Sequence, residues 1–136
     1  MATELKERGT NAGLGNADAI ATCAVKNIDT ARRFYEGTLG LVPLPSEESG
    51  VLAYKSGKSS ILVYQSEYAG TNQATAVTWA VRDLEAAVEA LKAKGVRFEH
   101  YDLPDTTRTG DVHGSGKTKA AWFKDPDGNI LAVVSG

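Results

Sequence analysis

The segment AAWFKDPDGNILAVV, residues 120–134, contains two apolar runs separated by the turn-forming sequence DPDGN. Asp, Pro, Gly and Asn favour chain reversal, so the segment predicts a strand, a tight turn and a final strand. VLAYKSGKSSILVY, residues 51–64, repeats this plan around its own glycine turn. An offset of 69 residues pairs Tyr54 with Phe123 and Ile61 with Ile130. The sequence therefore predicts the same hairpin twice.

A strand followed by a helix is also repeated, ahead of each hairpin. AIATCAVKNIDTARRFYEGTLGL (19–41) and TAVTWAVRDLEAAVEALKAKGV (75–96) each begin with an apolar run and continue with apolar residues at helical spacing. Asn27 and Asp83 are suited to cap the helix starts, and Gly40 and Gly95 to end the helices. The two segments match at an offset of 56 residues.

These repeats predict two tandem β-α-β-β-β modules, at residues 19–65 and 76–135, joined by the polar linker 66–75. A chance likeness between two strand-helix-strand segments remains the alternative. After the helices, the patterns predict strands at 51–55, 60–65, 96–102, 119–124 and 130–134. Residues 1–17 contain little apolar sequence and are expected to form a flexible arm ahead of a single domain at 18–136.

Composition limits the classes of binding partner and the cellular compartment to be expected. A net charge of -2 and a pI near 5.7 give no electrostatic basis for binding nucleic acid or anionic lipid. The single cysteine, Cys23, has no partner for a disulfide within the chain, which favours a reducing compartment. No apolar leader or membrane-spanning run is found. We expect a cytoplasmic protein that binds neither nucleic acid nor membranes.

Two motifs resemble the vicinal oxygen chelate superfamily, which includes glyoxalase I, bleomycin-resistance proteins and extradiol dioxygenases. VKNIDTARRFYEGTLGL is similar to the family pattern V-x-D-x-x-x-A-x-x-F-Y-x-x-x-L-G-L, with Asn27 where Asp is preferred, and WFKDPDGNIL is similar to F-x-D-P-D-G-N-x-x-E. The resemblance implies an α+β fold in which paired modules curl a mixed sheet into an incomplete barrel around a cleft, with helices outside. It does not fix a reaction, because this fold supports several.

The resemblance also implies where a metal would be held. In metal-dependent relatives the ligands come from the opening and last strands of each module, which places them here on Ile20, Val63, Ala76 and Ala132. None of these side chains has a lone pair for a cation, so we expect no metal and no cofactor. A metal in the 105–118 loop remains possible, since His100, His113, Asp102, Asp105 and Asp111 lie near one another in sequence.

Strand alternation indicates which side chains face the cleft. If the four ligand positions face it, Thr22, Thr78 and Gln65 face it too and offer sparse polar anchors. Trp122, and Tyr101 with it, is expected to form an aromatic wall. Apolar walls with a few polar groups are typical of a small-molecule site. Alternatively, these aromatic residues fill space between the modules or at a dimer interface.

The leading hypothesis is a glyoxalase/bleomycin-resistance-like protein that binds a hydrophobic or aromatic small molecule without a metal. The alternative is an enzyme, a glyoxalase-type lyase or isomerase or a dioxygenase, with an atypical site in which His113 or Glu67 is essential. We assign no catalytic residue. A third interpretation makes the apolar cleft a dimerisation surface. We expect a homodimer; whether modules pair within a chain or are swapped between chains stays open.

Overall fold

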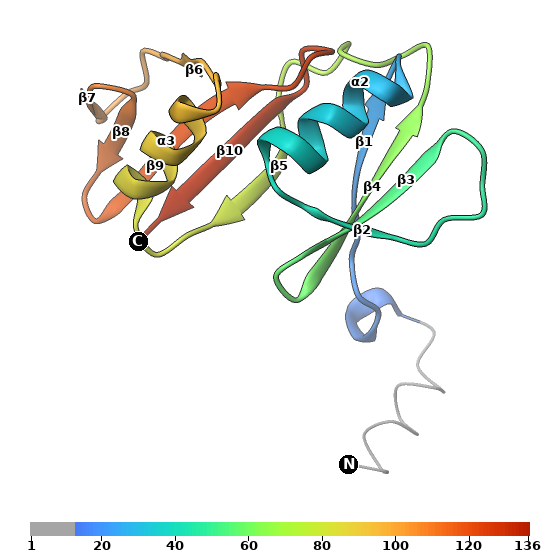
Figure 1. Cartoon of the computed structure of the whole chain (residues 1–136). Helices are drawn as coiled ribbons and strands as arrows, with labels where there is room; N and C mark the ends of the chain where they lie inside the picture. The colour runs from blue at the N-terminus through green and yellow to red at the C-terminus, as the bar shows by residue number, and fades with distance from the viewer. Residues whose placement is uncertain (1–12) are drawn as a thin grey trace.

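The computed structural model describes residues 13–136, so the predicted arm at 1–17 falls mostly outside the described residues. The first half of the chain forms a mixed four-stranded sheet in the order β1-β4-β3-β2. Helix α2 (Ile28–Arg32), extended by the π-helical segment η2 (Arg33–Thr38), lies across this sheet (Figure 1). Its strands are β1 (Ala21–Val25), β2 (Val42–Leu44), β3 (Val51–Ser56) and β4 (Ser59–Gln65).

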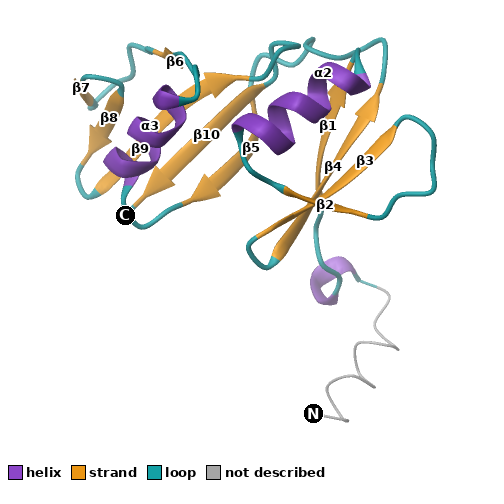
Figure 2. Ribbon diagram, in the orientation of Figure 1, coloured by secondary structure: helices purple, strands orange, loops and turns teal. Residues whose placement is uncertain are grey.

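The second half repeats this arrangement. Helix α3 (Leu84–Ala93) packs on β9 and β10 of a sheet in the order β5-β10-β9-β8-β7, and β6 also pairs with β9. Figure 2 shows both helices on the same side of the two sheets. The strands are β5 (Thr75–Ala80), β6 (Phe98–Glu99), β7 (Thr107–Thr109), β8 (Val112–Ser115), β9 (Thr118–Lys124) and β10 (Ile130–Ser135).

Helix starts follow from the predicted caps. The side chain of Asn27 accepts a hydrogen bond from the Thr30 amide at 2.9 Å, and that of Asp83 accepts one from the Ala86 amide at 3.0 Å. Each cap satisfies an amide that has no partner within the helix. Asn at position 27 therefore performs the capping role for which the family pattern prefers Asp.

The core lies between the helices and the faces of the sheets that they cover. Its largest fully buried side chains are Tyr35, Tyr54, Phe123, Leu84 and Leu131. Ring contacts join the two halves here: the ring centroids of Phe34 and Phe123 are 6.5 Å apart. The Trp79 indole also donates across the junction to the Ser56 hydroxyl, at 2.9 Å. Cys23 is buried in this core, and Trp79 is partly buried against it.

The α+β class and the repeated modules are confirmed, with two mixed sheets and no closed barrel. β1 of the first sheet lies beside β5 of the second without forming a hydrogen-bonded ladder with it (Figure 1). The two sheets therefore meet along these strands and through the shared core.

The segment from 96 to 118 differs from its prediction. The strand expected at 96–102 is reduced to β6, and the loop expected at 105–118 contains the hairpin β7-β8. The predicted strand is short because the alternation of apolar residues stops after Phe98. The hairpin was not predicted because its strands consist mainly of polar residues and glycine, without apolar alternation. The hairpin is held by pairing of β8 with β9, a contact distant from its own turn.

Candidate functional site

The face assigned to Val63 was wrong. Val63 pairs with Cys23 and is fully buried in the core beneath the helix. The reason is hairpin length: Ile61 pairs with Tyr54, seven residues earlier, whereas Leu131 pairs with Phe123, eight residues earlier. The last strand therefore shifts by one residue between the modules, and a one-residue shift reverses the face of every side chain. Leu62, not Val63, corresponds to Ala132.

The corrected set does not fit a metal. Ile20 precedes β1, Ala76 lies on β5, and Ala132 is buried beside Trp122 on β10. With Leu62, these positions present only hydrocarbon, whereas divalent cations require nitrogen, oxygen or sulfur donors. Within residues 13–136, no group of three or more His, Cys, Asp or Glu side chains is arranged to hold an ion.

A cavity of about 380 Å³ opens on the side of the second sheet away from its helix. We call it the aromatic cavity; it is lined by Gln73, Ala74, Thr75, Tyr101, Leu103, Trp122 and Ile130. Trp122 faces this side because it pairs with Ala132, while its neighbour Phe123 is buried in the core. The Trp122 indole donates to the Thr75 hydroxyl at 3.2 Å, which orients the ring.

Three rings pack together beside the aromatic cavity. The centroid of Tyr101 lies 5.4 Å from that of Trp122, and the centroid of His113 lies 4.9 Å from that of Trp122, both in edge-to-face arrangements. His113 is only 2% exposed, and its Nε2 accepts a hydrogen bond from the Tyr101 amide at 3.0 Å. Burial, and after it the nearby Glu99 carboxylate, raises the pKa of the Tyr101 hydroxyl above its usual range.

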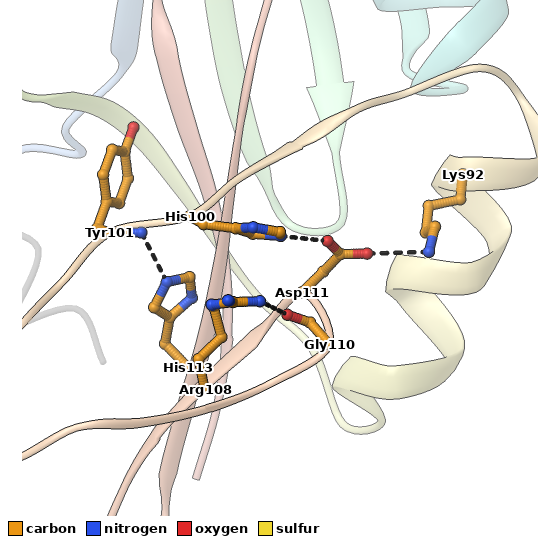
Figure 3. Close-up of polar contacts among 7 residues, drawn as sticks. All are labelled: Lys92, His100, Tyr101, Arg108, Gly110, Asp111 and His113. Atoms are coloured by element: carbon orange, nitrogen blue, oxygen red, sulfur yellow. Dashed lines mark hydrogen bonds and ion pairs between the residues drawn. The ribbon is translucent and has the colours of Figure 1, made fainter.

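A second cavity, of about 300 Å³, adjoins the first because Tyr101 and Leu103 line both. We call it the polar cavity; its other lining residues are His100, Asp102, Thr106, Arg108 and His113. Figure 3 shows the His113 ring between Tyr101 and Arg108, with His100 and Asp111 to one side. The Arg108 guanidinium donates to the Gly110 carbonyl at 2.6 Å, and this hydrogen bond fixes the position of the guanidinium beside the polar cavity.

Asp111 connects the polar cavity to helix α3. Its carboxylate lies 2.7 Å from His100 Nε2 and 2.9 Å from Lys92 Nζ (Figure 3). The hydrogen bond from His100, and to a lesser extent that from Lys92, holds the pKa of the Asp111 carboxyl below its usual range. The predicted neighbours of a loop metal are thus separated, with His100 bound to Asp111 and His113 bound to the Tyr101 amide.

The five predicted ligand-binding residues are not all brought together. Tyr101 and Trp122 line the aromatic cavity. Thr78 shares the face of Trp122 through their common partner Ala132 but does not line the cavity. Thr22 lies on the first sheet, with its hydroxyl bonded to the Ile20 carbonyl. Gln65 ends β4 on the same face as Val63, so it does not face the cleft as predicted, and it donates to the Lys26 carbonyl at 3.1 Å.

Sequence reasoning missed part of the lining and the setting of His113. Residues 73–75 belong to the predicted linker, yet they form one wall of the aromatic cavity. His113 was placed in a loop, whereas it is a buried strand residue that pairs with Ala120. The only signal for its burial was the single apolar residue before it, Val112.

Other candidate nucleophiles and bases are poorly placed. Cys23 is buried, and desolvation raises the pKa of its thiol, which disfavours the reactive thiolate. Glu67 is exposed in the turn after β4. These observations leave His113 as the buried titratable group beside the cavities.

Comparisons with solved structures show the same fold. The glyoxalase family protein from Bacillus anthracis is 19% identical, with a TM-score of 0.61 over 86% of this chain and 92% of that one. Lactoylglutathione lyase from Agrobacterium tumefaciens is 16% identical, with a TM-score of 0.64 over 88% and 93%. TnmS3, an antibiotic binding protein from Streptomyces sp. CB03234, is 19% identical, with a TM-score of 0.58 over 87% and 95%.

No functionally curated protein matches the chain at a significant level. None of the helices within residues 13–136 is long and apolar enough to cross a membrane. A family model matches residues 19–133, which include both repeated modules and both motifs. The chain belongs to the Glyoxalase/Bleomycin resistance protein/Dioxygenase superfamily.

Proposed function

We propose that this protein binds a hydrophobic or aromatic small molecule in the aromatic cavity and does so without a metal. The observation that carries this proposal is the aromatic wall of Tyr101 and Trp122, on the sheet face where Ala132 stands in place of a metal ligand. Such a wall contributes apolar area and ring stacking. TnmS3, an antibiotic binding protein with the same fold, supports a binding role.

In this proposal, the ligand stacks against the rings of Trp122 and Tyr101. Leu103 and Ile130 add apolar surface, while Thr75 holds the indole in place through its hydroxyl. Gln73 adds a side-chain amide to the lining. Because residues 13–136 place no donor set for a cation on this face, binding depends on shape, apolar burial and a small number of hydrogen bonds. Thr78 and Thr22 do not line the aromatic cavity, so we assign them no direct contact with the ligand.

The two tryptophans provide a direct test, because they lie on opposite faces of the second sheet. Trp79 lines a separate apolar cavity near α3, whereas Trp122 lines the aromatic cavity. The Trp79→Phe variant keeps Trp122 as its single tryptophan, and Trp122→Phe keeps Trp79. With the neutral fluorescent probe N-phenyl-1-naphthylamine, we expect saturable energy transfer in the first variant and at least about a tenfold loss of affinity in the second.

Dialysis against a chelator should leave that titration unchanged. Equal affinity of the two variants for the probe would contradict binding at Trp122. A stoichiometric divalent ion in protein purified without chelator, together with lyase, isomerase or dioxygenase turnover, would support the enzymatic alternative instead.

We also propose that a second copy of the chain covers the first sheet. On the face opposite α2, Tyr64 is 39% exposed, and Ile20, just before β1, is 51% exposed. Large apolar side chains grouped on one face favour an interface. Light scattering at high protein concentration distinguishes the resulting homodimer from a monomer. We expect the protein to be located in the cytoplasm.

A further inference from the structure

Among the described residues, two buried side-chain polar atoms have no hydrogen-bond partner: His113 Nδ1 and the Tyr101 hydroxyl. Both residues line the polar cavity. Buried polar atoms are nearly always paired, since an unpaired one loses its bonds to water without replacement. Two such atoms beside one cavity therefore indicate that this region is built for a partner that binds there.

The tautomer of His113 follows from its surroundings. A backbone amide can only donate, so Nε2, which receives the Tyr101 amide at 3.0 Å, must carry a lone pair. A neutral imidazole then has its proton on Nδ1, which makes the unpaired atom a donor. In Figure 3 this second nitrogen lies on the side of the ring toward Arg108 and away from the Tyr101 amide.

The charges around the polar cavity allow an acceptor to enter. Arg108 and His113 contribute donors, and the Thr106 hydroxyl already donates to the Pro104 carbonyl. Asp102 is the acidic lining residue, and it is exposed. A neutral oxygen acceptor is favoured over an anion here, because the Asp102 carboxylate offsets the Arg108 guanidinium.

We propose that the small molecule carries a carbonyl-type oxygen and that His113 Nδ1–H donates a hydrogen bond to it in the polar cavity. The aromatic part of the same molecule packs in the adjoining aromatic cavity, past the shared walls Tyr101 and Leu103. This inference rests on the proposed function and adds the chemical class of the ligand, an aryl carbonyl compound. His113 is then a specificity-determining residue that separates such compounds from plain hydrocarbons.

Acetophenone and ethylbenzene form a matched pair of probes, since both have a phenyl ring and a two-carbon substituent and differ by the carbonyl oxygen. In long-range proton–nitrogen NMR spectra we expect His113 to show the Nδ1–H tautomer. Acetophenone should shift both the His113 Nδ1 signal and the Trp122 indole signal. Ethylbenzene should shift the Trp122 signal and leave His113 Nδ1 in place.

The His113→Phe variant retains a ring and removes the donor. We expect its affinity for acetophenone, relative to ethylbenzene, to fall about tenfold, which is the effect of losing one hydrogen bond to a buried donor. Tyr68→Phe is the control: it removes an exposed hydroxyl that lines neither cavity, and the ratio should not change.

An unchanged ratio in His113→Phe, or an Nε2–H tautomer of His113, would overturn this inference while leaving hydrocarbon binding at Trp122 intact. If neither probe shifts the Trp122 signal, the proposed function fails, and the inference fails with it. The NMR measurement uses the unaltered protein, so it remains decisive even if His113→Phe does not fold.

Discussion

Asp125 shows why the DPDGN turn is informative about the fold. Its side chain is buried and accepts hydrogen bonds from the Tyr35 hydroxyl at 2.7 Å, from the amides of Asp127 and Asn129, and from the Asn129 side chain. The Asn129 side chain also donates to the Ala24 carbonyl at 2.7 Å. Tyr35 and Ala24 belong to the first module, so this turn ties one module to the other.

The Tyr35→Phe variant tests the hydrogen bond between Tyr35 and Asp125, because it removes only the hydroxyl oxygen. The substitution removes the hydroxyl and leaves the Asp125 carboxyl with one fewer donor in a buried setting, so we expect a loss of about 2 kcal/mol in the free energy of unfolding. Denaturant titration of both proteins measures it. Tyr68→Phe is the control, because Tyr68 is 70% exposed, and it should change stability by less than about 0.5 kcal/mol. A Tyr35→Phe protein as stable as the original would show that the bond contributes nothing.

A glycine in the connection between the modules supports the same turn. Gly70 has a φ of +75°, and a methyl group added there would collide with the Asp127 carbonyl. The backbone of the segment predicted as a simple linker therefore packs directly against the DPDGN turn. A side chain at this position would require both segments to move.

Among the elements, the β7-β8 hairpin has the most consequence for the site, because it carries Arg108 and His113. Two attachments position it: pairing with β9, and the Asp111 carboxylate in its turn, which reaches His100 and Lys92. The second attachment is electrostatic. The hairpin is therefore sensitive to the protonation of one carboxyl group.

The pKa of Asp111 is lowered in the folded protein, so its ionised form stabilises the fold. This contribution is complete above the unfolded pKa of about 3.9 and is lost as the pH falls through the lower folded value. Asp111→Asn should thus reduce stability by no more than about 1 kcal/mol at pH 7, with the difference vanishing well below pH 4. Denaturant titrations at several pH values check this. A difference that persists at low pH would assign the effect to packing instead of charge.

The elements differ in how far sequence determines them. Both long helices were predictable because capping residues and apolar spacing are local, and Asn27 and Asp83 act as expected. The register of Val63 was not predictable, because it depends on a one-residue difference in hairpin length. For the site, alternation placed Trp122 correctly, whereas His113 depends on pairing with a distant strand and escaped detection.

At the scale of the whole molecule, the two modules share one core. Phe34 contacts Phe123, Trp79 donates to Ser56, and Tyr35 donates to Asp125, and each of these contacts crosses from one module to the other. Separating the modules would expose these rings and leave buried polar groups unpaired. We therefore expect residues 18–136 to behave as a single domain, as the sequence predicts.

The chain provides a native probe for each module. The single thiol, Cys23, is buried in the first module, and both tryptophans lie in the second. In denaturant, the exposure of Cys23 to a thiol reagent and the change in tryptophan fluorescence should have the same midpoint, because one cooperative transition breaks the shared core. Cys23 reacting at a denaturant concentration where the tryptophan signal is still native would show that the first module opens alone. Tyr35→Phe should lower both midpoints together, since the bond that it removes joins the two modules.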